Sequence, residues 1–133
     1  MNAMPNPSEL PALVAECARR SVSLGLNRGT SGNVSARSLE GFLITPSGRD
    51  MTELAAVDMA PVDMEGRAPE GLKPSSEWRF HRDIYAAFPE AGAIVHAHSP
   101  FADHTFDAVA PSDHGAGREV RSVEGRALHR RRE

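Results

Sequence analysis

Apolar positions along the chain change between helical and strand-like spacing, and short polar turns separate the segments. The first segment carries an apolar stripe at roughly helical spacing. The stripe consists of Leu10, Leu13, Val14, Cys17 and Leu24. Ser8 is a suitable N-cap and Gly25 a suitable stop, so we predict a helix between them. Cys17 falls on the stripe and is expected to pack in the core.

Strand-like segments follow this helix. Residues 34–37 and 42–45 predict a pair of strands joined by a tight turn at 39–41. Thr52 is expected to cap a short helix. A third strand is predicted over 58–63, and Pro61 places it at a sheet edge because proline cannot donate to a ladder.

A second helix is predicted from Ser75 or Ser76 to about Ala87. The spacing i, i+4, i+8 predicts a core-facing stripe on this helix, formed by Phe80, Ile84 and Phe88. His81 is expected at the surface. Residues 93–98 predict a strand, and the pair Ser99-Pro100 is typical of another helix start.

The pattern ends near residue 103. Only nine of the thirty residues in 104–133 are apolar, arginines are frequent, and neither period persists. We therefore predict a domain over residues 1–103 and a separate, disordered tail over 104–133.

Composition and charge limit the classes of protein that the chain can belong to. The chain has 133 residues and a formal net charge of -3, so one domain is expected, with no general attraction to nucleic acid or to an anionic membrane. The single cysteine fits a reducing compartment. No apolar run is long enough to cross a bilayer, and no secretory signal is visible, so the expected location is the cytoplasm.

A candidate metal site lies in the strand at 93–98. His96 and His98 are two residues apart, so a regular strand turns both imidazoles to one face. Glu77 lies about twenty residues upstream, at a helix start. One oxygen and two nitrogen ligands suit Zn²⁺ or another borderline divalent ion. Ordinary packing of the histidines and a favourable helix dipole at Glu77 are the alternatives.

Three polar loops add a second kind of candidate chemistry. Residues 30–33, 45–48 and 75–76 supply hydroxyls, backbone N–H groups and a helix N-terminus. Such groups together form phosphate sites. Each loop taken alone is better explained as a turn or a cap, whereas all three in one small domain favour a phosphate site.

Four motifs, in order, resemble the class II aldolase/adducin family. They are GTSGNVS at 29–35, LITPSG at 43–48, PSSEWRFH at 74–81 and VHAH at 95–98. The most similar members are zinc-dependent sugar-phosphate aldolases of the fuculose-phosphate type. The resemblance implies a three-layer α/β/α sandwich with a mainly antiparallel central sheet, here incomplete at the C-terminus. It also implies a homotetramer, if the fold is complete, and a phosphorylated sugar as substrate.

The resemblance also implies residue roles. His96 and His98 would bind one zinc ion per subunit, and Glu77 would act as acid/base and could also sit on the metal. The residues implied in phosphate binding are Gly32, Asn33, Ser47, Gly48, Ser75 and Ser76. The implied activity is a lyase that uses metal-stabilised enediolate chemistry. A thiosugar-phosphate dehydratase and a pentulose-phosphate epimerase are enzymatic alternatives, although related epimerases tend to carry aspartate in place of Glu77.

The chain departs from the family near residue 102. The family's third histidine ligand lies some sixty residues beyond its His-x-His pair, and His104, His114 and His129 do not match that context. The change to arginine-rich sequence resembles truncation or a reading-frame change. A catalytically inactive family member, or an adducin-like domain without chemistry, is therefore the non-enzymatic alternative.

Overall fold

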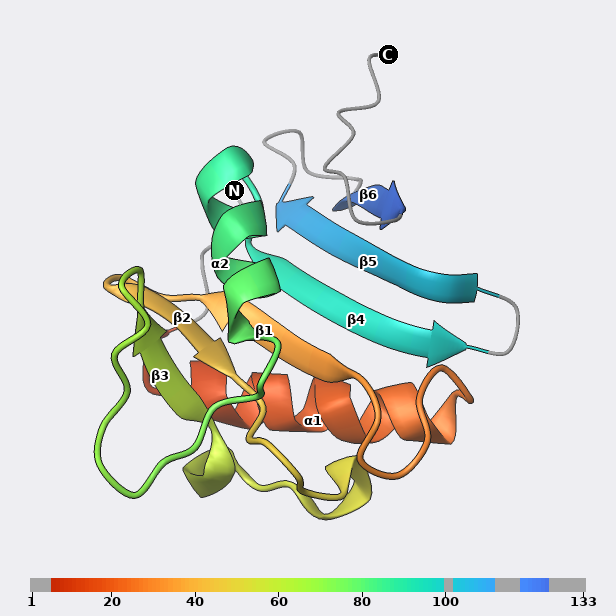
Figure 1. Ribbon diagram of the computed structural model, residues 1–133, viewed down its shortest axis with the longest axis horizontal. Coiled ribbons are helices and arrows are strands. Elements are labelled where there is room, and N and C mark those ends of the chain that lie inside the picture. Colours follow the sequence, from red (N-terminus) through yellow and green to blue (C-terminus); the bar gives the residue numbers. More distant parts are fainter. Residues whose placement is uncertain (1–5, 100–101, 112–117, 125–133) are drawn as a thin grey trace.

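A computed structural model of the chain describes residues 6–99, 102–111 and 118–124, with side chains for residues 6–97. Its helices and strands are shown in Figure 1. In chain order they are α1 (Leu10–Ser23), β1 (Asn33–Arg37), β2 (Gly41–Ile44), the 3-10 turns η1 (Met51–Glu53) and η2 (Ala56–Asp58), β3 (Ala60–Asp63), α2 (Trp78–Ala87), β4 (Ala93–Ser99), β5 (Ala102–Pro111) and β6 (Arg118–Glu124). Neither of the described α-helices is long and apolar enough to span a membrane.

The described strands form one sheet in the order β3-β2-β1-β4-β5-β6, and every pairing in it is antiparallel. The predicted β1–β2 pair is confirmed, with Ser35 opposite Ile44. The predicted third strand is also confirmed, and β3 with its Pro61 is an edge strand. β1 is central and pairs with β4, which sets Asn33 opposite His96.

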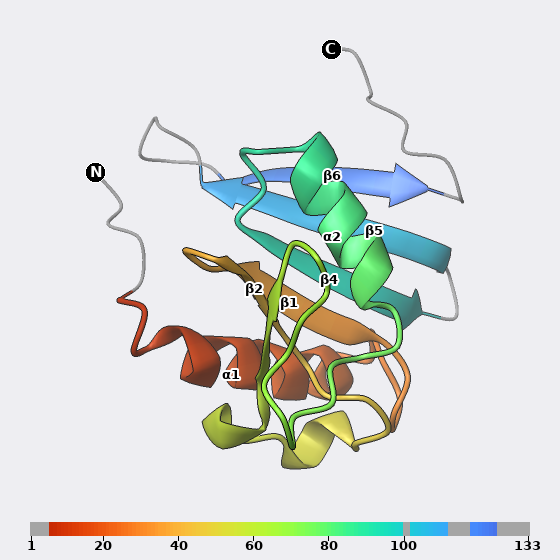
Figure 2. The same ribbon diagram turned by 60° about the vertical axis from the view of Figure 1, so that its left-hand side comes forward.

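Helices α1 and α2 cover opposite faces of the sheet (Figures 1 and 2). Two separate apolar clusters accompany them. One joins α1 to Val34 and Ala36 of β1, and the other joins α2 to β2, β3 and Ile94 of β4. These observations confirm the predicted α/β class, with an antiparallel sheet between two helical layers.

Helix α1 ends as predicted, but its most buried face is shifted from the predicted stripe. Gly25 has a φ of 78° directly after the helix and lets the chain turn away, as expected for its stop. The buried residues of α1 are Val14, Ala15, Ala18 and Ser21, whereas Leu13 and Leu24 are exposed. Leu10 and Cys17 of the predicted stripe are partly buried and pack against the same cluster, so the predicted stripe is confirmed in part.

Helix α2 likewise buries a face that differs from the prediction. Ile84 and Phe88 are buried as expected, but Phe80 is 49% exposed and His81 is fully buried. The buried positions 81, 84, 85 and 88 follow the i, i+3, i+4, i+7 pattern of a helix, which leaves Phe80 outside. The surface assignment of His81 was therefore wrong, because polar groups on β1 lie opposite it.

The side chain of Arg37 on β1 is hydrogen-bonded to the C-terminal end of α2. Its Nε donates to the carbonyl of Ala91, and its Nη2 donates to the carbonyls of Tyr85 and Phe88. The guanidinium also lies over the Tyr85 ring, 4.7 Å from the ring centre. A cation thus satisfies carbonyl groups at and beyond the C-terminus of α2, where the helix dipole favours positive charge.

The structure corrects two local expectations. Asp50, rather than Thr52, caps the turn η1, because its carboxylate accepts from the backbone N–H of Thr52. The helix predicted to begin at Ser99 is replaced by strand: β4 runs through Ser99, and β5 begins at Ala102.

Strand backbone also occurs in the segment predicted to be disordered. Residues 102–111 pair with β4, and residues 118–124 pair with β5. Pairing of this kind is made by backbone groups on the open edge of β4, so it needs no regular apolar period. Residues 112–117 and 125–133 lie outside the described residues, and the division of the chain at residue 103 stays a prediction.

Candidate active site

The three polar loops predicted from the sequence lie together at one end of the sheet. Thr45 accepts from the backbone N–H of Val34 through its side chain, and its carbonyl accepts from the N–H of Ser75. The N–H of Ser47 donates to the carbonyl of Lys73. Hydrogen bonds between the loops thus bring the end of β2 beside the start of α2 and the start of β1.

Glu77 and His96 meet at this end. The Glu77 carboxylate contacts Nδ1 of His96, and Asn33 donates to the same carboxylate oxygen from its side-chain amide at 2.8 Å. The His96 side chain is 2% exposed and the Glu77 side chain 34%. The pair therefore joins a buried imidazole to a carboxylate that solvent or a ligand reaches.

Below this pair runs a buried hydrogen-bond relay, formed by Tyr85, Ser35, His81, Asn33 and Glu77. Tyr85 and Ser35 hydroxyls lie 2.7 Å apart, and the Ser35 hydroxyl lies 2.6 Å from Nδ1 of His81. Nε2 of His81 bonds to the side-chain oxygen of Asn33, and the side-chain NH₂ group of Asn33 donates to Glu77. The relay links the core of the α2 layer to the accessible carboxylate.

Burial sets the protonation of two members of the relay. Burial, with a smaller contribution from the nearby charge of His96, lowers the pKa of His81 to about 3. Burial also raises the pKa of Tyr85 far above its ordinary value, against the opposing effects of Ser35 and Arg37. Both groups are therefore neutral at physiological pH.

The predicted metal ligands are brought together in part. Carboxylate and imidazole are both ligand types of Zn²⁺, so Glu77 and His96 fit a divalent ion by their chemistry. The side chain of His98 lies outside the described residues. Within residues whose side chains are described, no third histidine, cysteine or carboxylate completes a metal-binding group.

The predicted phosphate-binding residues differ in their exposure. Asn33 and Ser75 are buried, Ser47 and Gly32 are half-buried, and the remaining two, Gly48 and Ser76, are exposed. The side chain of Asn33 is engaged by Glu77 and His81. Its role in phosphate binding stays a prediction, as does that of the other five.

Sequence reasoning missed His81, Ser35 and Tyr85. The signal that could have found them is the alternation of polar residues in β1, where Asn33, Ser35 and Arg37 share one face. Three polar side chains on a face that also packs a helix require polar partners on that helix. His81 and Tyr85 are four residues apart on α2 and supply them.

Gly32 is held against Asn27 beneath the site. Its φ is 80°, and a Cβ at this position would overlap with the Asn27 amide. That amide donates to the backbone carbonyl of His96 at 3.3 Å and to the Ser21 hydroxyl. The close approach thus couples the loop before β1 to the strand that carries His96.

Replacing Gly32 with alanine is expected to lower the free energy of unfolding by about 3 kcal/mol. A left-handed alanine costs roughly 1–2 kcal/mol, and displacing the Asn27 amide from its partners adds about 1–2 more. Gly25→Ala is the matched control, because its φ is 78° but no atom lies within 4 Å of its Cβ position. Urea unfolding of both variants tests this, and equal losses would contradict it.

Acid is expected to destabilise the metal-free protein partly through His81. In the unfolded chain this imidazole takes up a proton near pH 6.5, whereas the folded chain resists it until about pH 3. Stability therefore falls as the pH falls through this window, at up to about 1.4 kcal/mol per pH unit from this residue. Urea unfolding between pH 7 and 5 should show a shallower slope for His81→Gln. Identical slopes would exclude this contribution.

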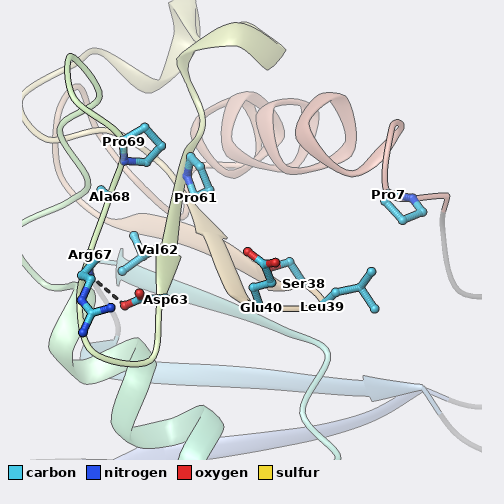
Figure 3. A pocket seen from close by; sticks show the side chains of 10 residues that line it. All are labelled: Pro7, Ser38, Leu39, Glu40, Pro61, Val62, Asp63, Arg67, Ala68 and Pro69. Atoms are coloured by element: carbon cyan, nitrogen blue, oxygen red, sulfur yellow. Dashed lines mark hydrogen bonds between the residues drawn. The ribbon is translucent and has the colours of Figure 1, made fainter.

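An open pocket lies at the other end of β1 and shares no residue with the Glu77–His96 pair (Figure 3). The turn at 38–40, β3 and residues 67–69 line it. Asp63 accepts from the backbone N–H of Arg67 there at 2.9 Å. Hydrogen bonds to the backbone lower the pKa of Asp63, which keeps its carboxylate ionised.

Comparison with known proteins shows similarity to class II aldolases and to related enzymes. The model of the family described as Class II Aldolase and Adducin N-terminal domain matches residues 12–106. A 5-methylthioribulose-1-phosphate/5-deoxyribulose-1-phosphate aldolase of Rhodospirillum rubrum is 51% identical over 86 residues, which are 65% of this chain and 39% of that protein. A methylthioribulose-1-phosphate dehydratase of Methylococcus capsulatus is 49% identical over 72 residues, which are 53% of this chain and 35% of that protein.

Solved structures agree on the fold. The crystal structure of an L-fuculose-1-phosphate aldolase from Thermus thermophilus superposes with a TM-score of 0.60 at 38% sequence identity. The match covers 70% of this chain and 48% of that one. The chain thus spans less than half the length of these relatives.

Proposed function

Because this chain belongs to the class II aldolase and adducin N-terminal domain family, we propose that it supplies part of the active site of a metal-dependent lyase. The reaction cleaves a phosphorylated sugar into a dihydroxyacetone-phosphate-like fragment and an aldehyde. One observation carries the proposal: Asn33 holds the Glu77 carboxylate against His96 at an accessible helix start.

Glu77 is the acid/base group of this proposal. In the direction of aldol addition it removes a proton from the carbon beside the donor carbonyl, and in cleavage it returns the proton. A carboxylate that accepts from Asn33 and is 34% exposed can receive such a proton without unfolding of its surroundings. General acid–base catalysis of this kind accelerates reactions by about 10²–10⁴-fold.

Glu77, His96 and His98 would hold the divalent ion, with zinc as the proposed metal. When bound, the ion supplies Lewis-acid polarisation of the substrate carbonyl. The burial of His96 fixes its ring independently of any metal, because β4 and the Asn27 contact position its backbone. The homotetramer that the family resemblance implies and the cytoplasmic location expected from the sequence complete the proposal.

Phosphate binding is assigned to the convergent polar loops. Ser75 and Ser76 precede α2 and lie at its N-terminus, which is the positive end of the helix dipole. Gly32, Ser47 and Gly48 come from the two loops that hydrogen bonds place beside them. The arrangement supports an anion next to Glu77, where the helix dipole favours negative charge.

A dehydratase that acts on a thiosugar phosphate is the second candidate. It is favoured by the 49% identity to the Methylococcus capsulatus dehydratase over 72 residues. The same base would then remove a proton before loss of water rather than before cleavage of a carbon–carbon bond. An adducin-like domain without chemistry is the non-enzymatic candidate.

One experiment separates these candidates. The protein that carries this chain is incubated with Zn²⁺, or with a chelator, and with L-fuculose 1-phosphate or 5-methylthioribulose 1-phosphate. Zinc-dependent release of dihydroxyacetone phosphate supports the lyase. Formation of a product that is lighter than the substrate by one water molecule supports the dehydratase instead of the lyase. Tight zinc binding with neither product supports the non-catalytic domain.

A further inference from the structure

The hydrogen-bond relay has one direction, and the direction follows from the chemistry of its Glu77 end. Glu77, as a carboxylate, only accepts, so Asn33 must turn its NH₂ group toward it. The oxygen of that amide then faces His81 and can only accept. Nε2 of His81 must therefore carry the hydrogen.

The other half of the relay follows in turn. With Nε2 protonated and the ring neutral, Nδ1 of His81 is an acceptor, so the Ser35 hydroxyl donates to it at 2.6 Å. The Ser35 oxygen then accepts from the Tyr85 hydroxyl at 2.7 Å. The Glu77 carboxylate thus sets the orientation of Asn33, that orientation requires the Nε2–H tautomer of His81, and the Ser35 and Tyr85 hydroxyls complete the matching hydrogen bonds.

All members of the relay except Glu77 are withdrawn from solvent. Tyr85 is 1% exposed, Ser35 and His81 are fully buried, and Asn33 is 4% exposed. A buried group whose hydrogen bond is reversed has no water to repair the mismatch. The buried members of the relay therefore hold the Asn33 amide in the one orientation that the Glu77 carboxylate accepts.

We propose that His81 is a positioning residue of this site, whose Nε2–H tautomer locks the Asn33 amide and so holds the Glu77 carboxylate beside His96. The inference rests on the proposed function for its catalytic consequence, but the relay itself is a property of the folded chain. His81 touches neither substrate nor metal in this role. It acts only through Asn33.

The first test observes the tautomer directly. In the metal-free protein labelled with ¹⁵N, long-range proton–nitrogen spectra at pH 7 should show His81 with a protonated Nε2 and an unprotonated Nδ1. The opposite tautomer, or an imidazolium, would overturn the proposal. This result does not depend on activity, so it stands or falls separately from the lyase assignment.

The second test uses variants. His81→Leu removes both hydrogen bonds, whereas His81→Gln can accept from Ser35 and donate to Asn33. We expect His81→Leu to lower kcat by about 100-fold with KM changed less than about threefold, and to weaken zinc binding by about tenfold. His81→Gln should recover at least tenfold of the lost kcat, and should bind zinc within about threefold of the parent protein.

The matched control is Ile84→Val, a change on the same buried face of α2 that leaves the relay intact. It should alter neither kcat nor zinc affinity, although it removes core volume. Equal losses in His81→Leu and His81→Gln, or an equal loss in Ile84→Val, would reduce His81 to a packing residue. If the parent protein shows no turnover, zinc affinity in the three variants and the tautomer spectrum still decide the inference.

Discussion

Replacing Glu77 with glutamine is expected to lower the rate of sugar-phosphate cleavage by about 1,000-fold, within the range of general acid–base catalysis. Glutamine has nearly the same shape but cannot take or return a proton near neutral pH. It also brings its own NH₂ group to face Asn33 or His96, where the carboxylate accepts a hydrogen bond. The change therefore removes the proton-transfer group and disturbs its anchoring at the same time.

The measurement is kcat with saturating Zn²⁺, so that weakened metal binding does not imitate a lost base. Glu65→Gln is the matched control, since Glu65 is an exposed carboxylate in the turn after β3. It should retain full activity. A Glu77→Gln variant within tenfold of the parent rate would remove Glu77 as the acid/base and leave it, at most, as a ligand.

His96→Gln is expected to weaken zinc binding by at least about 100-fold, because loss of a ligand should cost no less than loss of a residue that only orients one. The site would lose a nitrogen ligand that β4 holds in place beside Glu77. Activity at limiting zinc should fall in parallel and recover partly at high zinc. Calorimetric titration of the metal-free protein measures the affinity.

Ile94→Val is the control for His96→Gln. Ile94 lies two residues earlier on β4, is fully buried, and belongs to the apolar cluster under α2. Its truncation costs about 0.5–1.5 kcal/mol of stability without removing a ligand. Unchanged zinc affinity in His96→Gln would show that the ion, if bound, is held elsewhere.

Local periodicity was sufficient for the strands that build the site. Alternation in 34–37 and 42–45, with a tight turn between them, predicted the β1–β2 pair, and Pro61 predicted the edge. The strands at 102–111 and 118–124 were not predicted. Their pairing depends on the open edge of β4, which is a property of the folded sheet and not of those residues.

The buried faces of the helices were harder to predict, because the apolar residues of each helix mark its buried stripe only in part. Phe80 was expected inside and His81 outside, and the structure has the reverse. A histidine is buried at little cost when a hydroxyl and an amide satisfy its two nitrogens. Those partners lie more than forty residues away along the chain, so no local pattern reveals them.

The site, too, was predicted only in part. Motif spacing pointed to Glu77, His96 and the three loops, and the structure brings Glu77 to His96 and the loops to each other. The identity of the metal and the sugar cannot follow from these residues alone.

Strand β1 lets the two faces of the sheet change independently during evolution. Val34 and Ala36 face α1, while Asn33, Ser35 and Arg37 face α2 and satisfy its polar groups. Substitutions can therefore accumulate on one face without disturbing the other. A single inserted or deleted residue within the strand cannot be absorbed in this way. It would turn the apolar pair toward the relay and the polar side chains into the α1 core. Insertions and deletions in β1 should therefore be selected against, whereas substitutions are tolerated.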